Sequence, residues 1–143
     1  MIPHNLRILL VEDDDIDAEA VRRGFKKSGV DSPLYRASNG IQAIQMLCDE
    51  SGPFFENPYI ILLDLKMPRM NGIEFLQAIR KDESLRKSIV FVLTTSNDSQ
   101  DRLAAYSNFA AGYITKSKAG SEFRDLIEML DSYSRIIEFP LSR

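Results

Sequence analysis

Hydrophobic and polar positions alternate in blocks along the chain, and the blocks predict strands and helices in turn. Short apolar runs predict buried strands at Ile8–Val11, Ser32–Ala37, Tyr59–Leu63, Ile89–Leu93 and Gly112–Thr115. Apolar residues at helical spacing predict helices over about 15–28, from about 40, from about 72, over about 98–110 and over about 119–137. Five strand–helix units in succession predict an α/β fold, a doubly wound five-stranded parallel sheet with helices on both faces and right-handed crossovers.

Three details of the sequence make specific predictions about packing. In the first helix, one face is expected to carry the apolar residues Ile16, Ala20, Val21 and Phe25. Cys48 lies on the apolar pattern of the second helix, which predicts a buried, inert thiol. The turn-rich segment 51–58 is expected to be a long loop whose two adjacent phenylalanines fold back on the domain.

Length and composition indicate one soluble globular domain over residues 1–143, with a core of about 6–135 and a C-terminal extension over 136–143. The chain is 44% hydrophobic and 27% charged, which argues against disorder. A net charge of −3 and the absence of a basic stripe argue against nucleic-acid binding. No apolar stretch is long enough for a membrane span and no signal peptide is evident, so we expect a cytoplasmic protein.

The ends of the predicted strands collect chemically active side chains at one edge of the sheet. These are Glu12, Asp13, Asp64, Thr94 and Lys116. Two carboxylates about 4 Å apart repel by about 4 kcal/mol at an effective dielectric near 20, and one lysine does not compensate three of them. Oxygen-only ligands favour a hard cation, so Mg²⁺ is the expected cofactor. The alternative is a solvated acidic cluster without a metal.

A carboxylate nucleophile, Mg²⁺, a lysine and a hydroxyl together suit phosphoryl transfer to the carboxylate, with Asp64 forming an acyl phosphate. The hydroxyl of Thr94 is placed to hydrogen-bond a phosphoryl oxygen. The only histidine, His4, precedes the first strand, which excludes a Ser/His/Asp triad or a multi-histidine metal site in the core.

At these positions the chain resembles the receiver domain of two-component response regulators over nearly its whole length. Four segments carry the resemblance in order: Leu9-Leu10-Val11-Glu12-Asp13-Asp14, Leu62-Leu63-Asp64-Leu65-Lys66-Met67-Pro68 with Asn71-Gly72, Val92-Leu93-Thr94, and Gly112-Tyr113-Ile114-Thr115-Lys116. The resemblance implies a flavodoxin-like fold with strand order 2-1-3-4-5. It also implies a stand-alone regulator that accepts a phosphoryl group from a histidine kinase and is an enzyme only for its own phosphorylation and dephosphorylation.

The resemblance assigns roles to individual residues. Asp64 would be the phospho-acceptor and Lys116 would contact the phosphoryl group. The implied Mg²⁺ ligands are Asp13 and Asp64 directly, Glu12 largely through water, and the backbone carbonyl of Lys66. Thr94 and Tyr113 would form the switch pair. Asp14 and Asp15 have no matched role and are interpreted as acids that suit the start of a helix.

Three features depart from the usual receiver pattern. Ser117 follows the lysine where a proline, often after a cis peptide, is common; the 51–58 loop is long; and the C-terminus runs past the fold. With Thr94-Thr95-Ser96, these features resemble the stand-alone receivers paired with bacterial phytochrome histidine kinases. A bacterial phytochrome is therefore the kinase partner to which this finer resemblance points.

The last helix carries more apolar positions than one core stripe needs. Its second stripe, continued into the tail, is Leu126, Met129, Tyr133, Ile136 and Phe139. Surplus apolar surface often marks an interface, which predicts a homodimer through the last helix and tail. The alternative is that the tail, through Leu141, packs back on its own domain.

Three rival functions remain to be weighed. A dehalogenase-type phosphatase needs a second aspartate at position 66, which is lysine. A flavodoxin-like cofactor protein needs a phosphate-binding loop where the acidic Glu12-Asp13-Asp14-Asp15 segment stands. An interaction module that is never phosphorylated would not need an intact set of acids, hydroxyl and lysine.

Overall fold

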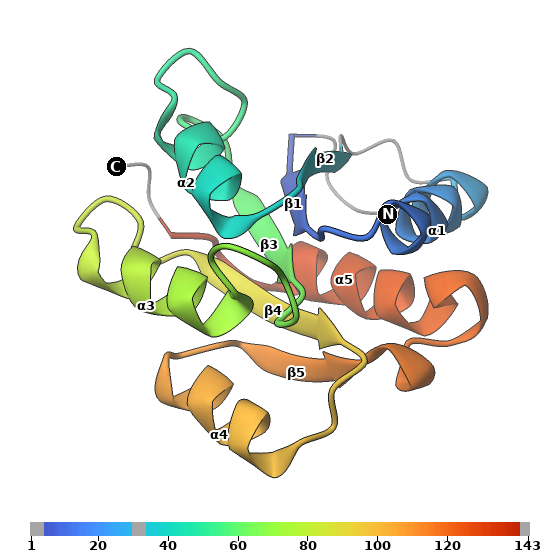
Figure 1. Cartoon of the computed structure of the whole chain (residues 1–143). Helices are drawn as coiled ribbons and strands as arrows, with labels where there is room; N and C mark the ends of the chain where they lie inside the picture. The colour runs from blue at the N-terminus through green and yellow to red at the C-terminus, as the bar shows by residue number, and fades with distance from the viewer. Residues whose placement is uncertain (1–4, 30–33, 141–143) are drawn as a thin grey trace.

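Five parallel strands form the sheet on which the rest of the chain is built (Figure 1). The strands are β1 (Arg7–Val11), β2 (Leu34–Ala37), β3 (Tyr59–Leu63), β4 (Ile89–Thr94) and β5 (Gly112–Thr115). Their order is β2-β1-β3-β4-β5, and every neighbouring pair is parallel, which confirms the predicted topology. The computed structural model describes residues 5–29 and 34–140. His4, the expected strand start at Ser32 and the tail residue Leu141 lie outside these ranges.

Each strand is followed by a helix, and most helices begin at a side chain that caps the first turn. The helices are α1 (Asp15–Lys27), α2 (Gly40–Cys48), α3 (Gly72–Lys81), α4 (Ser99–Ser107) and α5 (Arg124–Ile136). The caps of the first four helices are Asp14, Asn39, Asn71 and Asp98, whose side chains accept backbone N–H groups of the first turn. Across the described ranges, no helix combines the length and the apolar character needed to cross a membrane.

Side chains alternate between the two faces of the sheet and build two separate cores. Helices α1 and α5 cover one face, and α2, α3 and α4 cover the other (Figure 1). The α1–α5 core takes Ile8 and Leu10 of β1, whereas Leu9 and Val11 point into the other core. Both faces of the sheet are therefore dry, and polar chemistry is confined to the ends of the strands.

Two packing predictions for the first two helices are wrong. Ile16 is 79% exposed, because it lies nine positions before the buried Phe25, which is two and a half turns at 3.6 residues per turn and places it on the opposite side of the helix. Cys48 is exposed, because it follows the buried Leu47 by one position and so faces about 100° away from it. The α1 core face is built instead from Ala18, Val21 and Phe25.

The last helix begins later than its apolar pattern predicts. The sequence predicts a start at about 119, but two short 3₁₀ turns occupy 116–118 and 121–123, and α5 starts at Arg124. Gly120, Glu122 and Phe123 all have positive φ, which an α-helix cannot include. The carbonyl of Glu122 packs directly on Gly24 of α1, where a Cβ atom would collide with it. This close contact between α1 and the turn before α5 is the physical reason for the delayed start.

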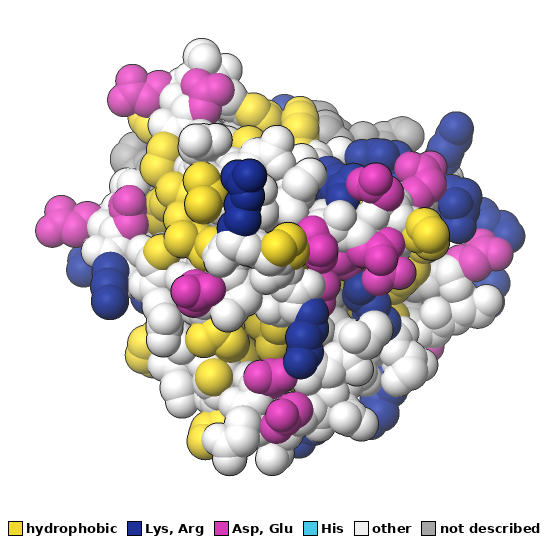
Figure 2. Space-filling view, in the orientation of Figure 1, with side chains coloured by type: hydrophobic (Ala, Val, Ile, Leu, Met, Phe, Trp, Pro, Cys, Tyr) yellow, Lys and Arg dark blue, Asp and Glu magenta, His cyan; other side chains and the backbone are white. Residues whose placement is uncertain are grey.

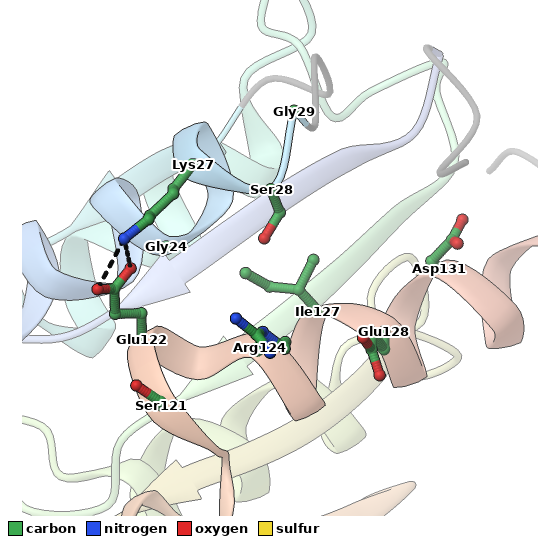
Figure 3. A pocket seen from close by; sticks show the side chains of 10 residues that line it. All are labelled: Gly24, Lys27, Ser28, Gly29, Ser121, Glu122, Arg124, Ile127, Glu128 and Asp131. Atoms are coloured by element: carbon green, nitrogen blue, oxygen red, sulfur yellow. Dashed lines mark hydrogen bonds and ion pairs between the residues drawn. The ribbon is translucent and has the colours of Figure 1, made fainter.

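An ion pair and a shallow hollow mark the same junction. Lys27 Nζ lies 2.9 Å from a Glu122 carboxylate oxygen, and Figure 3 shows the pair at one end of the hollow between α1 and α5. The hollow has a volume of about 520 Å³ and is lined by side chains of both signs, among them Lys27, Arg124 and Glu128. None of the strand-end residues Glu12, Asp64 and Lys116 lines it.

The 51–58 loop folds back on the domain as predicted. Phe54 is fully buried, and its ring meets Tyr35 and Tyr59 edge-on at centroid distances of 5.2 and 5.7 Å. Phe55 is only half-buried. The loop is therefore anchored at one aromatic residue, at the edge of the sheet opposite the strand-end acids.

Replacing that anchor should destabilise the whole domain. Phe54→Ala is expected to lower the free energy of unfolding by about 3–5 kcal/mol, because it opens a cavity in the core. Urea denaturation followed by circular dichroism measures the loss. Phe55→Ala in the same loop is the matched control and should cost clearly less. Equal costs for the two variants would contradict the anchoring role of Phe54.

Candidate functional site

Hydrogen bonds of the sheet extend into the first residues after the strands and fix the candidate site. The backbone N–H of Glu12 donates to Ala37 O at 3.0 Å, and that of Asp64 donates to Val11 O at 3.0 Å. Both residues are thus held as if they were still part of their strands. Figure 2 shows acidic side chains gathered over this region, where β1 ends.

Three carboxylates meet at this point, as the sequence predicts. Oxygens of Glu12, Asp13 and Asp64 all lie within 4.8 Å of one another. Glu12 is 1% exposed and Asp64 is 6% exposed, while Asp13 is half-buried. At this separation each pair of charges repels by about 3.5 kcal/mol or more at an effective dielectric near 20. The all-oxygen donor set fits a hard divalent cation, which would relieve the repulsion.

Lys116, the first residue after β5, extends its side chain to the acidic cluster. Its ammonium donates to Glu12 Oε1 at 2.7 Å and to Asp17 Oδ2 at 2.8 Å. The carboxylate of Asp17, in the first turn of α1, was not among the predicted site residues. Its sequence signal is weak, since an acid in a first helical turn usually serves the helix dipole. Asp17 meets Lys116 because of the way α1 is oriented about its own axis, which the sequence pattern does not specify.

Burial and the neighbouring charges shift the pKa values of Glu12 and Lys116. Burial raises the pKa of Glu12 to about 7; the hydrogen bond from Lys116 opposes this shift, and the nearby Asp64 carboxylate adds to it. Burial alone would lower the pKa of Lys116, but the hydrogen bonds to Asp17 and Glu12 outweigh burial and the pKa is raised. The ammonium therefore stays charged, and Glu12 is the neighbouring acid whose raised pKa lets it exchange a proton near neutral pH.

The two remaining acids of the loop after β1 have structural roles. Asp14 caps α1 by accepting the N–H groups of Ile16 and Asp17 at 2.8 and 3.0 Å, which confirms its interpretation as a helix-start acid. Asp15 pairs with Arg36 of β2 at 2.7 Å. The same guanidinium donates to the backbone oxygen of Glu12 at 2.9 Å, so β2 also holds the loop that carries the site.

Gly72 and the turn after β3 shape the other side of the site. A Cβ atom on Gly72 would lie 2.5 Å from the backbone oxygen of Asp64, so the approach requires glycine. Lys66 is exposed, and its N–H lies 3.5 Å from Asp64 Oδ1. The Lys116–Ser117 peptide is trans, because no cis peptide occurs in the described ranges.

The side chains of Thr94 and Tyr113 both form hydrogen bonds with the backbone of Ser96. Thr94 is fully buried and its hydroxyl accepts the N–H of Ser96 at 3.3 Å. The hydroxyl of Tyr113 donates to the backbone oxygen of Ser96 at 2.8 Å. Arg102 of α4 stacks over the Tyr113 ring, 5.9 Å from its centroid. The segment between β4 and α4 thus connects the predicted switch residues.

The residues of the predicted dimer stripe divide between the core and the surface. Leu126 is 2% exposed in the α1–α5 core, and Met129, Tyr133 and Phe139 pack against the same core. The Tyr133 ring meets Phe91 edge-on at 5.2 Å. Ile136 alone of the five is fully exposed, at 79%. In the described part of the tail, Phe139 packs on its own domain, as the alternative prediction expects, while Ile136 leaves an exposed apolar side chain for the predicted dimer.

Comparison with known proteins finds the same architecture. The sequence model of the response regulator receiver domain matches residues 8–128. Response regulator Rcp1 of Synechocystis is 33% identical, covering 88% of this chain and 86% of Rcp1. A probable methanogenesis regulatory protein, FilR2 of Methanothrix harundinacea, is also 33% identical, with 88% and 81% covered.

Solved structures agree with these sequence matches. The Mn²⁺-bound form of Rcp1 superposes with a TM-score of 0.71 at 32% identity, covering 94% of this chain and 98% of that one. The phosphorylated cyanobacterial phytochrome response regulator RcpA superposes with a TM-score of 0.73 at 27% identity, covering 94% and 97%.

Protonation of Glu12 should make the stability of the metal-free protein depend on pH. The ordinary pKa of this carboxyl is 4.5, and in the folded protein it is about 7. Between these values the folded state holds a proton that the unfolded state has lost, so stability falls as pH rises from about 4.5 to 7. Urea unfolding in a chelator at several pH values measures the slope.

Glu12→Gln supplies the comparison, since it cannot titrate but keeps the shape of the side chain. Its stability should fall less than that of the wild type over this pH interval. Parallel pH profiles for the two proteins would contradict the assignment of the proton to Glu12.

Proposed function

The chain belongs to the response regulator receiver domain family, and we propose that it accepts a phosphoryl group on Asp64 and thereby changes the surface that a partner reads. The observation that carries the proposal is the Asp64 carboxylate, which lies within 4.8 Å of oxygens of two further acids at the carboxyl end of the sheet. A donor can reach it there, while the dry faces of the sheet keep it fixed in place.

In the proposed reaction, a carboxylate oxygen of Asp64 attacks the phosphorus of a phosphohistidine on a kinase. A P–O bond forms and the P–N bond breaks, and the bonding electron pair stays on the imidazole nitrogen. Asp64 loses no proton, because the ionised carboxylate is the nucleophile. Lys116 would offset charge on the transferring oxygens. The protein would then be an enzyme only for its own phosphorylation and dephosphorylation.

We propose Mg²⁺ as the cofactor of this reaction. Glu12, Asp13 and Asp64, with the backbone carbonyl of Lys66, would hold it. When bound, the ion supplies positive charge that offsets the carboxylates and the phosphoryl oxygens. The oxygen-only donor set supports a hard cation, and the Mn²⁺-bound form of the similar Rcp1 supports a divalent one.

Thr94 and Tyr113 are proposed as the switch pair. If the Thr94 hydroxyl turned to donate to a phosphoryl oxygen, the weak 3.3 Å bond that it accepts from the Ser96 N–H would be disturbed. Breaking that bond would change the segment at Ser96, whose backbone oxygen accepts the hydrogen bond of the Tyr113 hydroxyl. One charge-assisted hydrogen bond contributes about 1.5–3 kcal/mol, which is enough to bias two arrangements of this segment.

The kinase partner we propose is a bacterial phytochrome histidine kinase, and the proposed location is the cytoplasm. The named similarity to RcpA, a phytochrome response regulator, supports this partner. The turn at Ser117 and the long 51–58 loop support it as well. No nucleic-acid partner is proposed, because the net charge is −3.

Phosphorylation of Asp64 can be tested directly. With Mg²⁺ and acetyl phosphate, the wild type should gain one acid-stable, base-labile phosphoryl adduct, seen by mass spectrometry of the intact protein. Asp64→Asn should gain none, because an amide does not attack phosphorus. Glu19→Gln, an exposed change elsewhere on α1, is the control and should react like the wild type.

The same proteins can be followed by NMR with beryllofluoride, which stands in for the phosphoryl group. Amide resonances of Thr94 and Ser96 should shift in the wild type and stay in place in Asp64→Asn. A wild type that forms no adduct and shows no Mg²⁺-dependent shift would mark the protein as an interaction module that is never phosphorylated.

We also propose a homodimer through the last helix and tail. Ile136, 79% exposed, is the residue of the stripe that remains free for a partner. Ile136→Glu should shift sedimentation from dimer to monomer, because a charge would be buried in the interface. Leu103→Glu, at an exposed aliphatic residue of α4, is the control. A wild-type monomer with and without beryllofluoride would defeat the dimer.

A further inference from the structure

Two acids of unequal burial share the Lys116 ammonium. Glu12 and Asp17 accept its hydrogen bonds at 2.7 and 2.8 Å. The side chain of Glu12 is 2% exposed, whereas that of Asp17 is 42% exposed. Water can replace a lysine at Asp17 but not at Glu12, because only Asp17 borders solvent. If the ammonium must change partners, Asp17 is therefore the acid that it gives up at lower cost.

The fold holds Asp17 firmly in place beside the lysine. Its backbone N–H donates to the capping carboxylate of Asp14 at 3.0 Å, so its position in the first turn is fixed. The loop before it is fixed in turn by Arg36, through Asp15 and the oxygen of Glu12. The carboxylate of Asp17 thus contacts Lys116 from the fixed first turn of α1, whereas Asp64 follows β3.

An ammonium has three N–H donors, and two of those of Lys116 are taken by these acids. In the described part of the chain, the carboxylate of Asp64 accepts no hydrogen bond from this lysine, although its negative charge helps to raise the pKa of Lys116. A phosphoryl group on Asp64 would bring three strong acceptor oxygens and up to two negative charges. The lysine must then be drawn toward Asp64.

We propose that Asp17 is a positioning residue that holds Lys116 toward α1 while Asp64 is unmodified and releases it when Asp64 carries a phosphoryl group. This inference rests on the proposed phosphorylation of Asp64. Asp17 then opposes the phosphorylated state, because its ion pair with Lys116 must break first. Removing the Asp17 charge should make the site bind a phosphoryl group more tightly.

The test is a calorimetric titration of beryllofluoride into the full chain at saturating Mg²⁺. Asp17→Asn should bind about two- to fivefold more tightly than the wild type, the range expected when a partly exposed ion pair no longer competes. Asp15→Asn is the matched control: it removes the same charge from the same helical turn, but its partner is Arg36. It should bind like the wild type.

A second measurement follows the Lys116 side chain directly by NMR. The ¹³Cε resonance of Lys116, assigned with Lys116→Arg, should move when beryllofluoride binds to the wild type. In free Asp17→Asn it should already lie closer to the bound position. An unchanged free-state resonance, or affinity equal to or weaker than that of Asp15→Asn, overturns the role of Asp17. If the wild type binds no beryllofluoride at all, the proposed function itself fails, which is a separate result.

Discussion

The site depends on a repulsion that the sheet does not allow to relax. The carboxylates of Glu12, Asp13 and Asp64 repel one another, and in a flexible chain they would move apart. Here the backbone of Glu12 is hydrogen-bonded to β2 and that of Asp64 to β1, so the carboxylates are anchored to the ladder of a sheet that is buried on both faces. Folding of the apolar core therefore supplies the energy that holds three like charges within 4.8 Å.

For the same reason, positive charge at this edge of the sheet strongly stabilises the three carboxylates. Lys116 compensates part of the negative charge, and it is divided between a buried and a partly exposed acid. A cation or a phosphoryl group would change which acids need the lysine. The arrangement thus links the protonation of Glu12, the position of Lys116 and the chemical state of Asp64. All three depend on the same set of interacting charges, so a change in one of them shifts the other two.

Much of this site could be predicted from the sequence, and the missing parts have identifiable physical causes. Apolar runs fix strands, and parallel strands bring their ends together, so Glu12, Asp64, Thr94 and Lys116 could be placed at one edge. Asp17 could not, because its contact depends on the rotation of α1, which is set by packing against α5.

The start of α5 and the packing of its apolar stripes were missed for a related reason. Backbone packing of Glu122 on Gly24 leaves no trace in hydrophobic periodicity, so the helix was expected to begin too early. Periodicity also cannot tell a residue that faces its own sheet from one that faces a partner, and Leu126 and Tyr133 proved to face the sheet. Positions near helix ends, such as Ile16, are the least constrained by the pattern.

The size of each contribution decides how the proposed switch can work. Moving a two-state population from 1:99 to 99:1 takes about 5.5 kcal/mol, and one charge-assisted hydrogen bond contributes about 1.5–3 kcal/mol. Thr94 alone therefore cannot complete the change, and Lys116, a bound cation and a partner surface must share it. An ion pair with a partly exposed acid is worth less than any of these. Asp17 can thus tune how readily the phosphorylated state is reached without preventing it, which is the behaviour expected of a residue that restrains Lys116 rather than one that reacts.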